Sequence, residues 1–127
     1  MNKWTREQQR AIESEGNLIV SAAAGAGKTA VLTERIVSRI RAGAPVESLL
    51  VLTFTRAAAA EMKGRISNRL NQLADEAGTT EEMRYLRRQA RNVDGAFIST
   101  IHAFCARVLR RHYHAVGLPA RAKTADE

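Results

Sequence analysis

Three short apolar runs, at residues 18–21, 49–53 and 96–99, predict β-strands. Each run carries mainly consecutive apolar side chains, whereas a strand with one exposed face alternates apolar and polar residues. Continuous apolar runs are typical of strands that helices cover on both faces of a parallel sheet. Because helical patterns lie between the runs, the chain is predicted to have an α/β fold with a mainly parallel sheet and flanking helices.

Apolar side chains that recur at steps of three and four predict helices around these strands. The expected helical ranges are 5–14, 28–41, 56–77, a segment that follows residue 79, and 101–115. The apolar stripe of the longest helix consists of Ala59, Met62, Ile66, Leu70 and Leu73. Thr79 and Glu82 have the spacing of a capping box, which favours a helix start there. Glycines mark the expected helix ends, at Gly16, Gly43, Gly78 and Gly117.

A glycine-bearing loop joins the first predicted strand to the helix that begins at residue 28. The loop consists of Ala22, Ala23, Ala24, Gly25, Ala26, Gly27, Lys28 and Thr29. Backbone N–H groups and the helix dipole converge on a phosphate in such a loop, and glycine permits positive φ and close approach of the main chain. Lys28 can reach the β- and γ-phosphate oxygens, and the Thr29 hydroxyl suits a phosphate-bound Mg²⁺ ion. The loop therefore predicts an ATP–Mg²⁺ site, in which Lys28 and Thr29 are the candidate catalytic residues.

The strict form of this loop would have glycine at position 22, where this chain has Ala22. The alternative interpretation is an ordinary Ala/Gly turn into a helix that contains Lys28 and Thr29 by coincidence. The strand and helix patterns on either side favour the phosphate loop, because the motif requires that context.

Composition limits the partners and the compartment. The chain has 127 residues, enough for one domain, and its 20 Lys and Arg against 13 Asp and Glu give a net charge of +7. This excess predicts a polyanionic partner, either nucleic acid or an anionic membrane surface. No signal peptide or membrane-spanning stretch is expected, and the single Cys105, expected to be buried, indicates a reducing, cytoplasmic location. No set of Cys and His has metal-ligand spacing, and His112 and His114 are expected to be solvated.

Arginines dominate the last third of the chain. Four of them share one face of a predicted helix: Arg84, Arg87, Arg88 and Arg91. Such a run is either a solvated helix face or a surface that contacts DNA, and the sequence leaves both interpretations open.

Four segments, in order, resemble one family. They are residues 4–12, the loop at 22–29, residues 53–66 and residues 99–105. Together they resemble the N-terminal end of superfamily 1 DNA helicases of the UvrD/Rep type, and look most similar to the AddA-like helicase subunits of helicase–nuclease complexes. Ala22 in place of the first glycine is usual in that family. The resemblance implies that residues 1–127 form the N-terminal part of a RecA-like ATP-binding domain, the first of two.

The resemblance also implies residue roles. Gln8 resembles the glutamine that contacts adenine, although Thr5 and Gln8 also have capping-box spacing. Two sets of residues resemble the family's single-stranded-DNA contacts: Thr53, Phe54, Thr55, Arg56 and Arg65, and Thr100, His102 and Phe104. The alternatives are that Phe54 is a core residue, that the threonines are helix caps, and that His102 and Phe104 form a packed or capping pair.

The activity implied by the resemblance is that of an ATP-dependent DNA helicase that works with a nuclease or helicase partner subunit. Neither acidic pair, Asp75-Glu76 or Asp126-Glu127, follows a predicted strand. The chain is therefore expected to hold phosphates, but not to hydrolyse ATP alone, and to be part of a larger sheet. Two other classes stay open: a P-loop enzyme of another kind, such as a small-molecule kinase, and a non-enzymatic basic module that binds nucleic acid.

Overall fold

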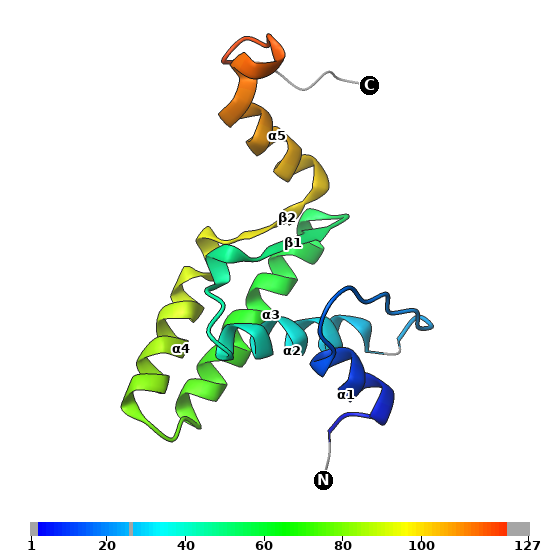
Figure 1. The fold of residues 1–127 in the computed structure, drawn as a ribbon, viewed down its shortest axis with the longest axis vertical. Helices are drawn as coiled ribbons and strands as arrows, with labels where there is room; N and C mark the ends of the chain where they lie inside the picture. The colour runs from blue at the N-terminus through cyan, green and yellow to red at the C-terminus, as the bar shows by residue number, and fades with distance from the viewer. Residues whose placement is uncertain (1–2, 26, 122–127) are drawn as a thin grey trace.

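The computed structural model of the chain describes residues 3–25 and 27–121. Its helices and strands, in chain order, are α1 (Arg6–Glu13), α2 (Lys28–Arg41), β1 (Leu50–Thr53), α3 (Arg56–Asp75), α4 (Thr80–Asn92), β2 (Phe97–Thr100) and α5 (Ile101–His112). Short 3₁₀ segments at Val46–Ser48, Val93–Gly95 and Tyr113–Val116 complete the list (Figure 1). The predicted helix over 28–41 is confirmed at both ends, and the helices expected at 56–77 and 101–115 end a few residues earlier.

The two strands β1 and β2 form a parallel sheet, in which Leu50 lies opposite Phe97 and Thr53 opposite Thr100. Helices α3 and α4 form the connection between them, and α3 packs against both strands (Figure 1). Parallel strands need such a crossover because a short turn cannot return the chain to the same end of the sheet. The predicted α/β organisation with a parallel sheet and flanking helices is therefore confirmed.

The strand predicted at residues 18–21 is wrong, because this segment has no strand structure. Its apolar side chains are exposed: Leu18 to 43%, Ile19 to 95% and Val20 to 47%. A strand requires a neighbouring strand to accept and donate its main-chain hydrogen bonds. Within the described residues only β1 and β2 are paired, so the apolar run has no partner.

The hydrophobic core lies between α2, α3, α4 and the sheet. Its largest wholly buried side chains are Ile40, Ile66, Leu70, Leu86, Val37, Val46 and Val93. Four of the five predicted stripe residues of α3 are buried, whereas Leu73 is half-buried and Ala74 takes the buried position beside it. The core therefore follows the helical periodicity, with a small rotation of the stripe at the end of α3.

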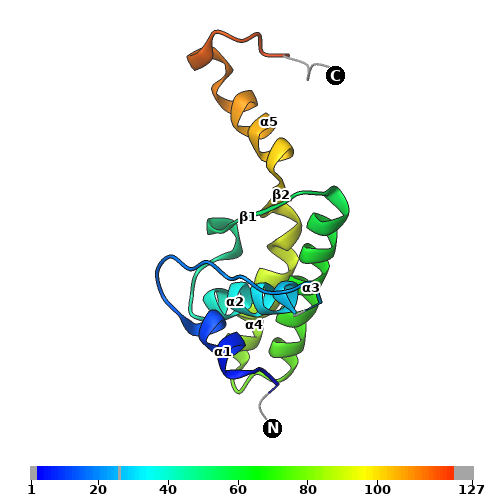
Figure 2. The same ribbon diagram turned by 90° about the vertical axis from the view of Figure 1, so that its right-hand side faces the viewer.

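Helix α5 projects away from the rest of the molecule in both perpendicular views (Figures 1 and 2). None of its residues is buried. Cys105, expected to be a buried apolar residue, is therefore exposed. The expectation rested on the usual preference of cysteine for the interior, and α5 has no interior face in this structure.

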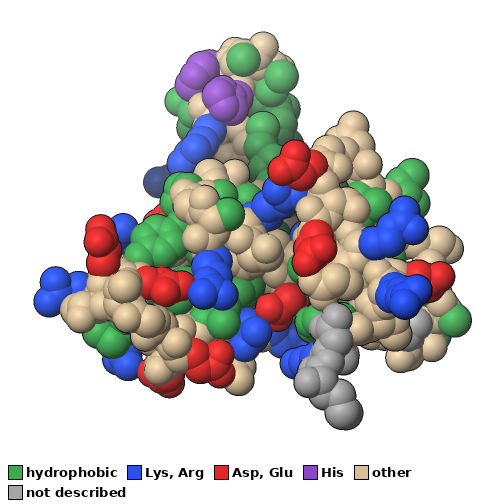
Figure 3. Space-filling view, turned by 60° about the horizontal axis from the view of Figure 1, so that its bottom comes forward, with side chains coloured by type: hydrophobic (Ala, Val, Ile, Leu, Met, Phe, Trp, Pro, Cys, Tyr) green, Lys and Arg blue, Asp and Glu red, His purple; other side chains and the backbone are tan. Residues whose placement is uncertain are grey.

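Charged side chains are distributed over the surface rather than gathered in one basic patch. On the face shown in Figure 3, Lys and Arg side chains alternate with Asp and Glu side chains, and histidines lie on the projecting end. The four arginines of α4 are exposed, as a solvated face requires; Arg87 pairs with Asp75 at 3.0 Å, and Arg88 lies over the Tyr85 ring. Among the described residues, no helix combines the length and apolarity needed to cross a membrane.

Candidate nucleotide and nucleic-acid site

The glycines of the 22–29 loop adopt the backbone conformation that the sequence predicted. Gly25 and Gly27 both have φ of +79°, in the left-handed region that side chains other than glycine rarely enter. Gly27 is the N-cap of α2 and offers no side chain to its first turn, which also lacks acidic residues. The first N–H groups of α2 therefore form the positive end of a helix with no side-chain acceptor, an arrangement that suits an anion. Ala26 lies outside the described residues.

Lys28 folds back over this loop. Its Nζ donates a hydrogen bond to the Ala22 carbonyl at 2.7 Å, although the side chain is exposed. The ammonium therefore lies over the concave side of the loop and could exchange one carbonyl acceptor for phosphate oxygens. Thr29 follows in the first turn of α2 and is also exposed; its carbonyl accepts from the Thr33 hydroxyl at 2.8 Å. The donor set fits a polyphosphate, since it combines an ammonium, a hydroxyl and main-chain N–H groups.

Gln8 fulfils the capping interpretation and also lies beside the loop. Thr5 N donates to Gln8 Oε1 at 2.9 Å, and Gln8 N donates to Thr5 Oγ1 at 3.2 Å, which completes the capping box of α1. A Cβ atom added to Gly27 would lie 3.4 Å from Gln8 Nε2. One side chain therefore closes the first turn of α1 with its oxygen and directs its amide nitrogen to the start of α2.

The carboxyl ends of β1 and β2 lie side by side, and a helix begins after each. Thr55 caps α3 by accepting from Ala58 N at 3.1 Å, and Thr100 caps α5 by accepting from Ala103 N at 3.1 Å. Thr53, opposite Thr100 in the sheet, donates its hydroxyl to the Thr55 carbonyl at 3.0 Å. The helix-cap alternative is thus confirmed for Thr55 and Thr100, and the same caps place two positive helix ends at one edge of the sheet.

Phe54 is 92% exposed at this edge, so the interpretation of Phe54 as a core residue is wrong. His102 is also exposed, in the first turn of α5. Phe104 instead packs on Phe97, with ring centroids 6.4 Å apart and an interplanar angle of 76°. The packed alternative therefore holds for Phe104 and not for His102.

The two predicted arginines of this edge differ in their surroundings. Arg65 pairs with Glu61 one turn earlier on α3, at 2.7 Å. Arg56 is the first residue of α3 and is exposed beside the capped end of the helix. Arg56 therefore adds positive charge at the edge itself, whereas the charge of Arg65 is partly compensated by its partner.

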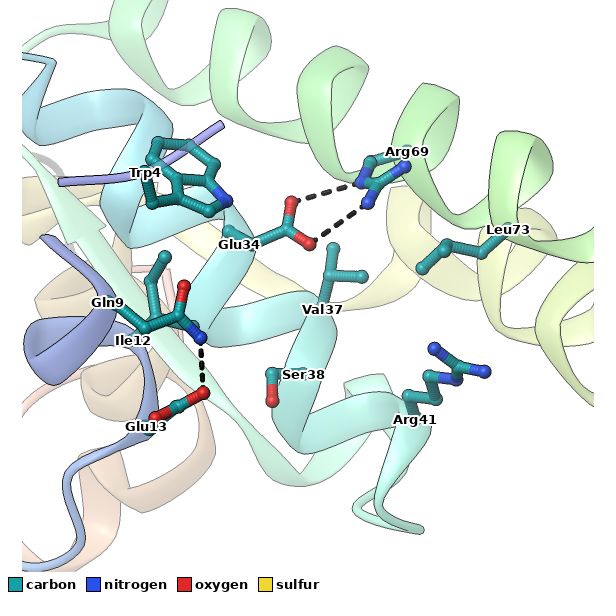
Figure 4. Close-up of a pocket in the computed structure, with 10 residues that line it drawn as sticks. All are labelled: Trp4, Gln9, Ile12, Glu13, Glu34, Val37, Ser38, Arg41, Arg69 and Leu73. Atoms are coloured by element: carbon teal, nitrogen blue, oxygen red, sulfur yellow. Dashed lines mark hydrogen bonds and ion pairs between the residues drawn. The ribbon is translucent and has the colours of Figure 1, made fainter. Parts of the chain in front are cut away.

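Sequence reasoning missed an ion pair that joins α2 to α3. Glu34 accepts both hydrogen bonds of an Arg69 fork, at 3.0 and 3.1 Å, in a cavity of about 220 Å³ lined by Trp4, Ile12 and Leu73 among others (Figure 4). The hydrogen bond to Glu34 raises the pKa of Arg69 against the opposing effect of burial. A single acid and base separated by 35 residues carry no periodic signal, so no pattern in the sequence indicates this pair.

The acidic pair at the end of α3 does not approach the loop side of the helix start. Asp75 is the last residue of the 20-residue α3 and pairs with Arg87 of α4. At 1.5 Å per residue, about 30 Å of helix separates it from Arg56. Within the part of the chain that the structure describes, no group of three or more His, Cys, Asp or Glu is placed to hold a metal ion.

Parallel strands, covering helices and a positive-φ glycine loop at a helix start are typical of α/β proteins that bind nucleotide phosphates. Residues 4–127 match the family of UvrD/REP helicase N-terminal domains. The match covers nearly the whole chain, which therefore belongs to that family. The resemblance to UvrD/Rep helicases is thereby confirmed.

Curated relatives extend the match to a particular kind of protein, the larger ATP-dependent helicase/nuclease chains of bacteria. The chain is 48% identical over its whole length to one of these from Lactobacillus johnsonii, and 50% identical over 93% of its length to the protein of the same name from Lactobacillus acidophilus. It is 44% identical over 99% of its length to the protein of that name from Geobacillus thermodenitrificans. The chain spans about a tenth of the length of these relatives, as the alignments cover 10% of each. The resemblance to the AddA-like type is thereby confirmed as well.

Proposed function

We propose that this chain is the ATP-binding and single-stranded-DNA-contacting part of an ATP-dependent DNA helicase, in a RecA-like domain of which residues 1–127 form the N-terminal part. The observation that carries the proposal is the loop before α2, where two positive-φ glycines and the folded-back Lys28 form a cationic cradle. Membership of the UvrD/REP family supports it, because the family is named for helicases.

In this proposal the loop residues 22–29 hold the phosphates of ATP. Lys28 exchanges the Ala22 carbonyl for phosphate oxygens, Thr29 offers its hydroxyl to Mg²⁺, and Gln8 contacts the adenine edge. The bound ATP–Mg²⁺ supplies the phosphoryl group whose hydrolysis releases energy. The chain's own residues bind and orient the nucleotide, and the groups that activate water are expected in sequence beyond this chain.

The edge formed by the carboxyl ends of β1 and β2 is the proposed DNA contact. Two capped helix N-termini there can attract phosphates, and the exposed Phe54 ring can stack on a base. His102 and Arg56 add polar and cationic contacts, while Phe104 supports the edge through its packing on Phe97. Closure of the nucleotide site would move this edge along the strand and couple hydrolysis to translocation.

The relatives' names include a helicase and a nuclease activity. We therefore propose that the complete protein takes part in DNA processing for recombinational double-strand-break repair, together with a second helicase or nuclease subunit. The P-loop enzyme of another class is disfavoured by the family match. The non-enzymatic module differs from the proposal in one property, since it requires no nucleotide.

Substitution of Lys28 tests the proposal. Lys28→Ala should abolish binding of the β,γ-imido analogue of ATP, measured by calorimetry with Mg²⁺ in the protein at its natural length. The matched control is Lys63→Ala, which removes a lysine whose Nζ donates to the Asp94 carbonyl on another part of the surface. Unchanged affinity in Lys28→Ala would overturn the phosphate site, and equal losses in both variants would point to an unspecific effect of charge.

A further inference from the structure

Helix α1 carries Gln8 but has little to hold it in place. It contains eight residues, of which only Ile12 is buried. An isolated helix shorter than about 12 residues is marginal in water, so α1 depends on contacts with the rest of the molecule. The position of Gln8 is therefore only as well defined as those contacts.

Two arginines of α2 provide these contacts. Arg35 Nη1 donates to the Ala11 and Ser14 carbonyls, both at 2.7 Å, and Arg39 Nη2 donates to the Ser14 carbonyl at 2.8 Å. Carbonyls at the end of a helix have no partner within the helix, and that end carries a partial negative charge. Two guanidinium groups thus satisfy and neutralise the C-terminal end of α1.

The same helix α2 meets α1 at both of its ends. Arg35 and Arg39 lie about two and three turns after Lys28 and hold the C-terminal end of α1, while Gly27, just before Lys28, lies against the Gln8 amide. The amide is also fixed in orientation, because its oxygen accepts from Thr5 N. The distance and direction from the phosphate loop to Gln8 Nε2 therefore depend on the two arginines.

We propose that Arg35 and Arg39 are positioning residues that set the preference of this site for adenine, because they fix α1 and so hold Gln8 in register with the phosphate loop. The proposal rests on the proposed nucleotide function and adds to it a basis for base selectivity. Adenine presents a donor beside an acceptor, where guanine presents two acceptors. A glutamine amide that cannot flip matches one of these patterns and not the other.

The test compares three ligands in the protein at its natural length: the β,γ-imido analogues of ATP and GTP, and inorganic tripolyphosphate, each with Mg²⁺. Arg35→Met should lower the ratio of ATP-analogue to GTP-analogue affinity about tenfold, equal to about 1.4 kcal/mol, and leave tripolyphosphate affinity unchanged. Arg39→Met, which removes one hydrogen bond, should have a smaller effect, and Arg35→Lys should restore part of the ratio. The matched control is Arg41→Met, on the same helix, whose guanidinium pairs with Glu82 instead.

A double-mutant cycle separates positioning from general damage. In a Gln8→Ala background, Arg35→Met should leave the affinity ratio unchanged, because the arginine acts through Gln8. Hydrogen exchange of the amides of residues 6–13, without nucleotide, should accelerate in Arg35→Met and not in Arg41→Met. Should Arg35→Met fail to fold, Arg35→Lys and Arg39→Met carry the same measurements.

The outcomes distinguish this proposal from the function on which it rests. Loss of tripolyphosphate binding in Lys28→Ala, with an ATP preference unaffected by Arg35→Met and Arg39→Met, overturns the positioning role alone. An unchanged ratio in Gln8→Ala overturns it as well, and leaves the phosphate site intact. Unchanged exchange in residues 6–13 also contradicts it. Retained tripolyphosphate binding in Lys28→Ala overturns the nucleotide function itself.

Discussion

Phe54 gives the sharpest test of the proposed DNA edge, because the structure separates its fold role from its binding role. Its side chain is 92% exposed, so Phe54→Ala removes almost no buried apolar area. The free energy of unfolding should therefore change by no more than about 0.5 kcal/mol. A residue with so little part in folding contributes to binding or to nothing.

The expected binding effect follows from base stacking. One aromatic side chain contributes about 1–3 kcal/mol per stacked base. Phe54→Ala should therefore weaken binding of a labelled oligothymidine by a factor of about 5 to about 150. The measurement is fluorescence anisotropy at one fixed salt concentration, since phosphate contacts make the affinity depend steeply on salt.

Matched variants determine whether the ring itself matters. Phe54→Tyr keeps an aromatic face and should bind nearly as well as the parent protein, whereas Phe54→Leu keeps an apolar side chain without that face and should bind nearly as weakly as Phe54→Ala. Ile19→Ala removes an equally exposed apolar residue, 95% accessible, from outside the edge and should have no effect. Parent-like affinity of Phe54→Leu would refute the stacking argument, and parent-like affinity of Phe54→Ala would refute the edge as the binding surface.

Two further predictions concern stability and are measured by urea unfolding. Ile66→Ala, at a wholly buried position of the core, should lower the free energy of unfolding by about 2–5 kcal/mol, and a loss below about 1 kcal/mol would contradict the described packing. Glu34→Gln breaks the fork with Arg69, whose side chains are 19% and 26% exposed, and should cost about 1–2 kcal/mol, between a surface pair and a fully buried one. Glu61→Gln, in the exposed pair with Arg65, is its control and should cost at most about 0.5 kcal/mol.

The features that could be predicted from the sequence are local ones. Helix α2 has the predicted bounds because its apolar period, its glycine start and its glycine stop lie within one short stretch. The positive φ of Gly25 and Gly27 follows from the same local chemistry. Caps at Thr5, Thr55 and Thr79 are likewise present, since a cap depends on residues only three positions apart.

The features that could not be predicted depend on distant partners. An apolar run at 18–21 resembles the one at 49–53, yet only the second has a strand beside it in the described structure. Leu32 belongs to the apolar period of α2 and is nevertheless 41% exposed, beside Leu50 and Leu52. Periodicity indicates which side chains share a face, but the other elements of the fold decide whether that face is covered.

The phosphate loop of this chain is therefore supported from its helix side rather than from its strand side. Residues 18–21, which precede the loop, make no strand pairing in the described structure, so they give the loop no rigid base. Helix α2, in contrast, is anchored in the core by Val37 and Ile40, and it holds α1 through Arg35. Because Lys28, Gly27 and the Gln8 contact all depend on α2, changes that loosen α2 should affect phosphate and base recognition together, whereas changes in α1 should affect base recognition alone.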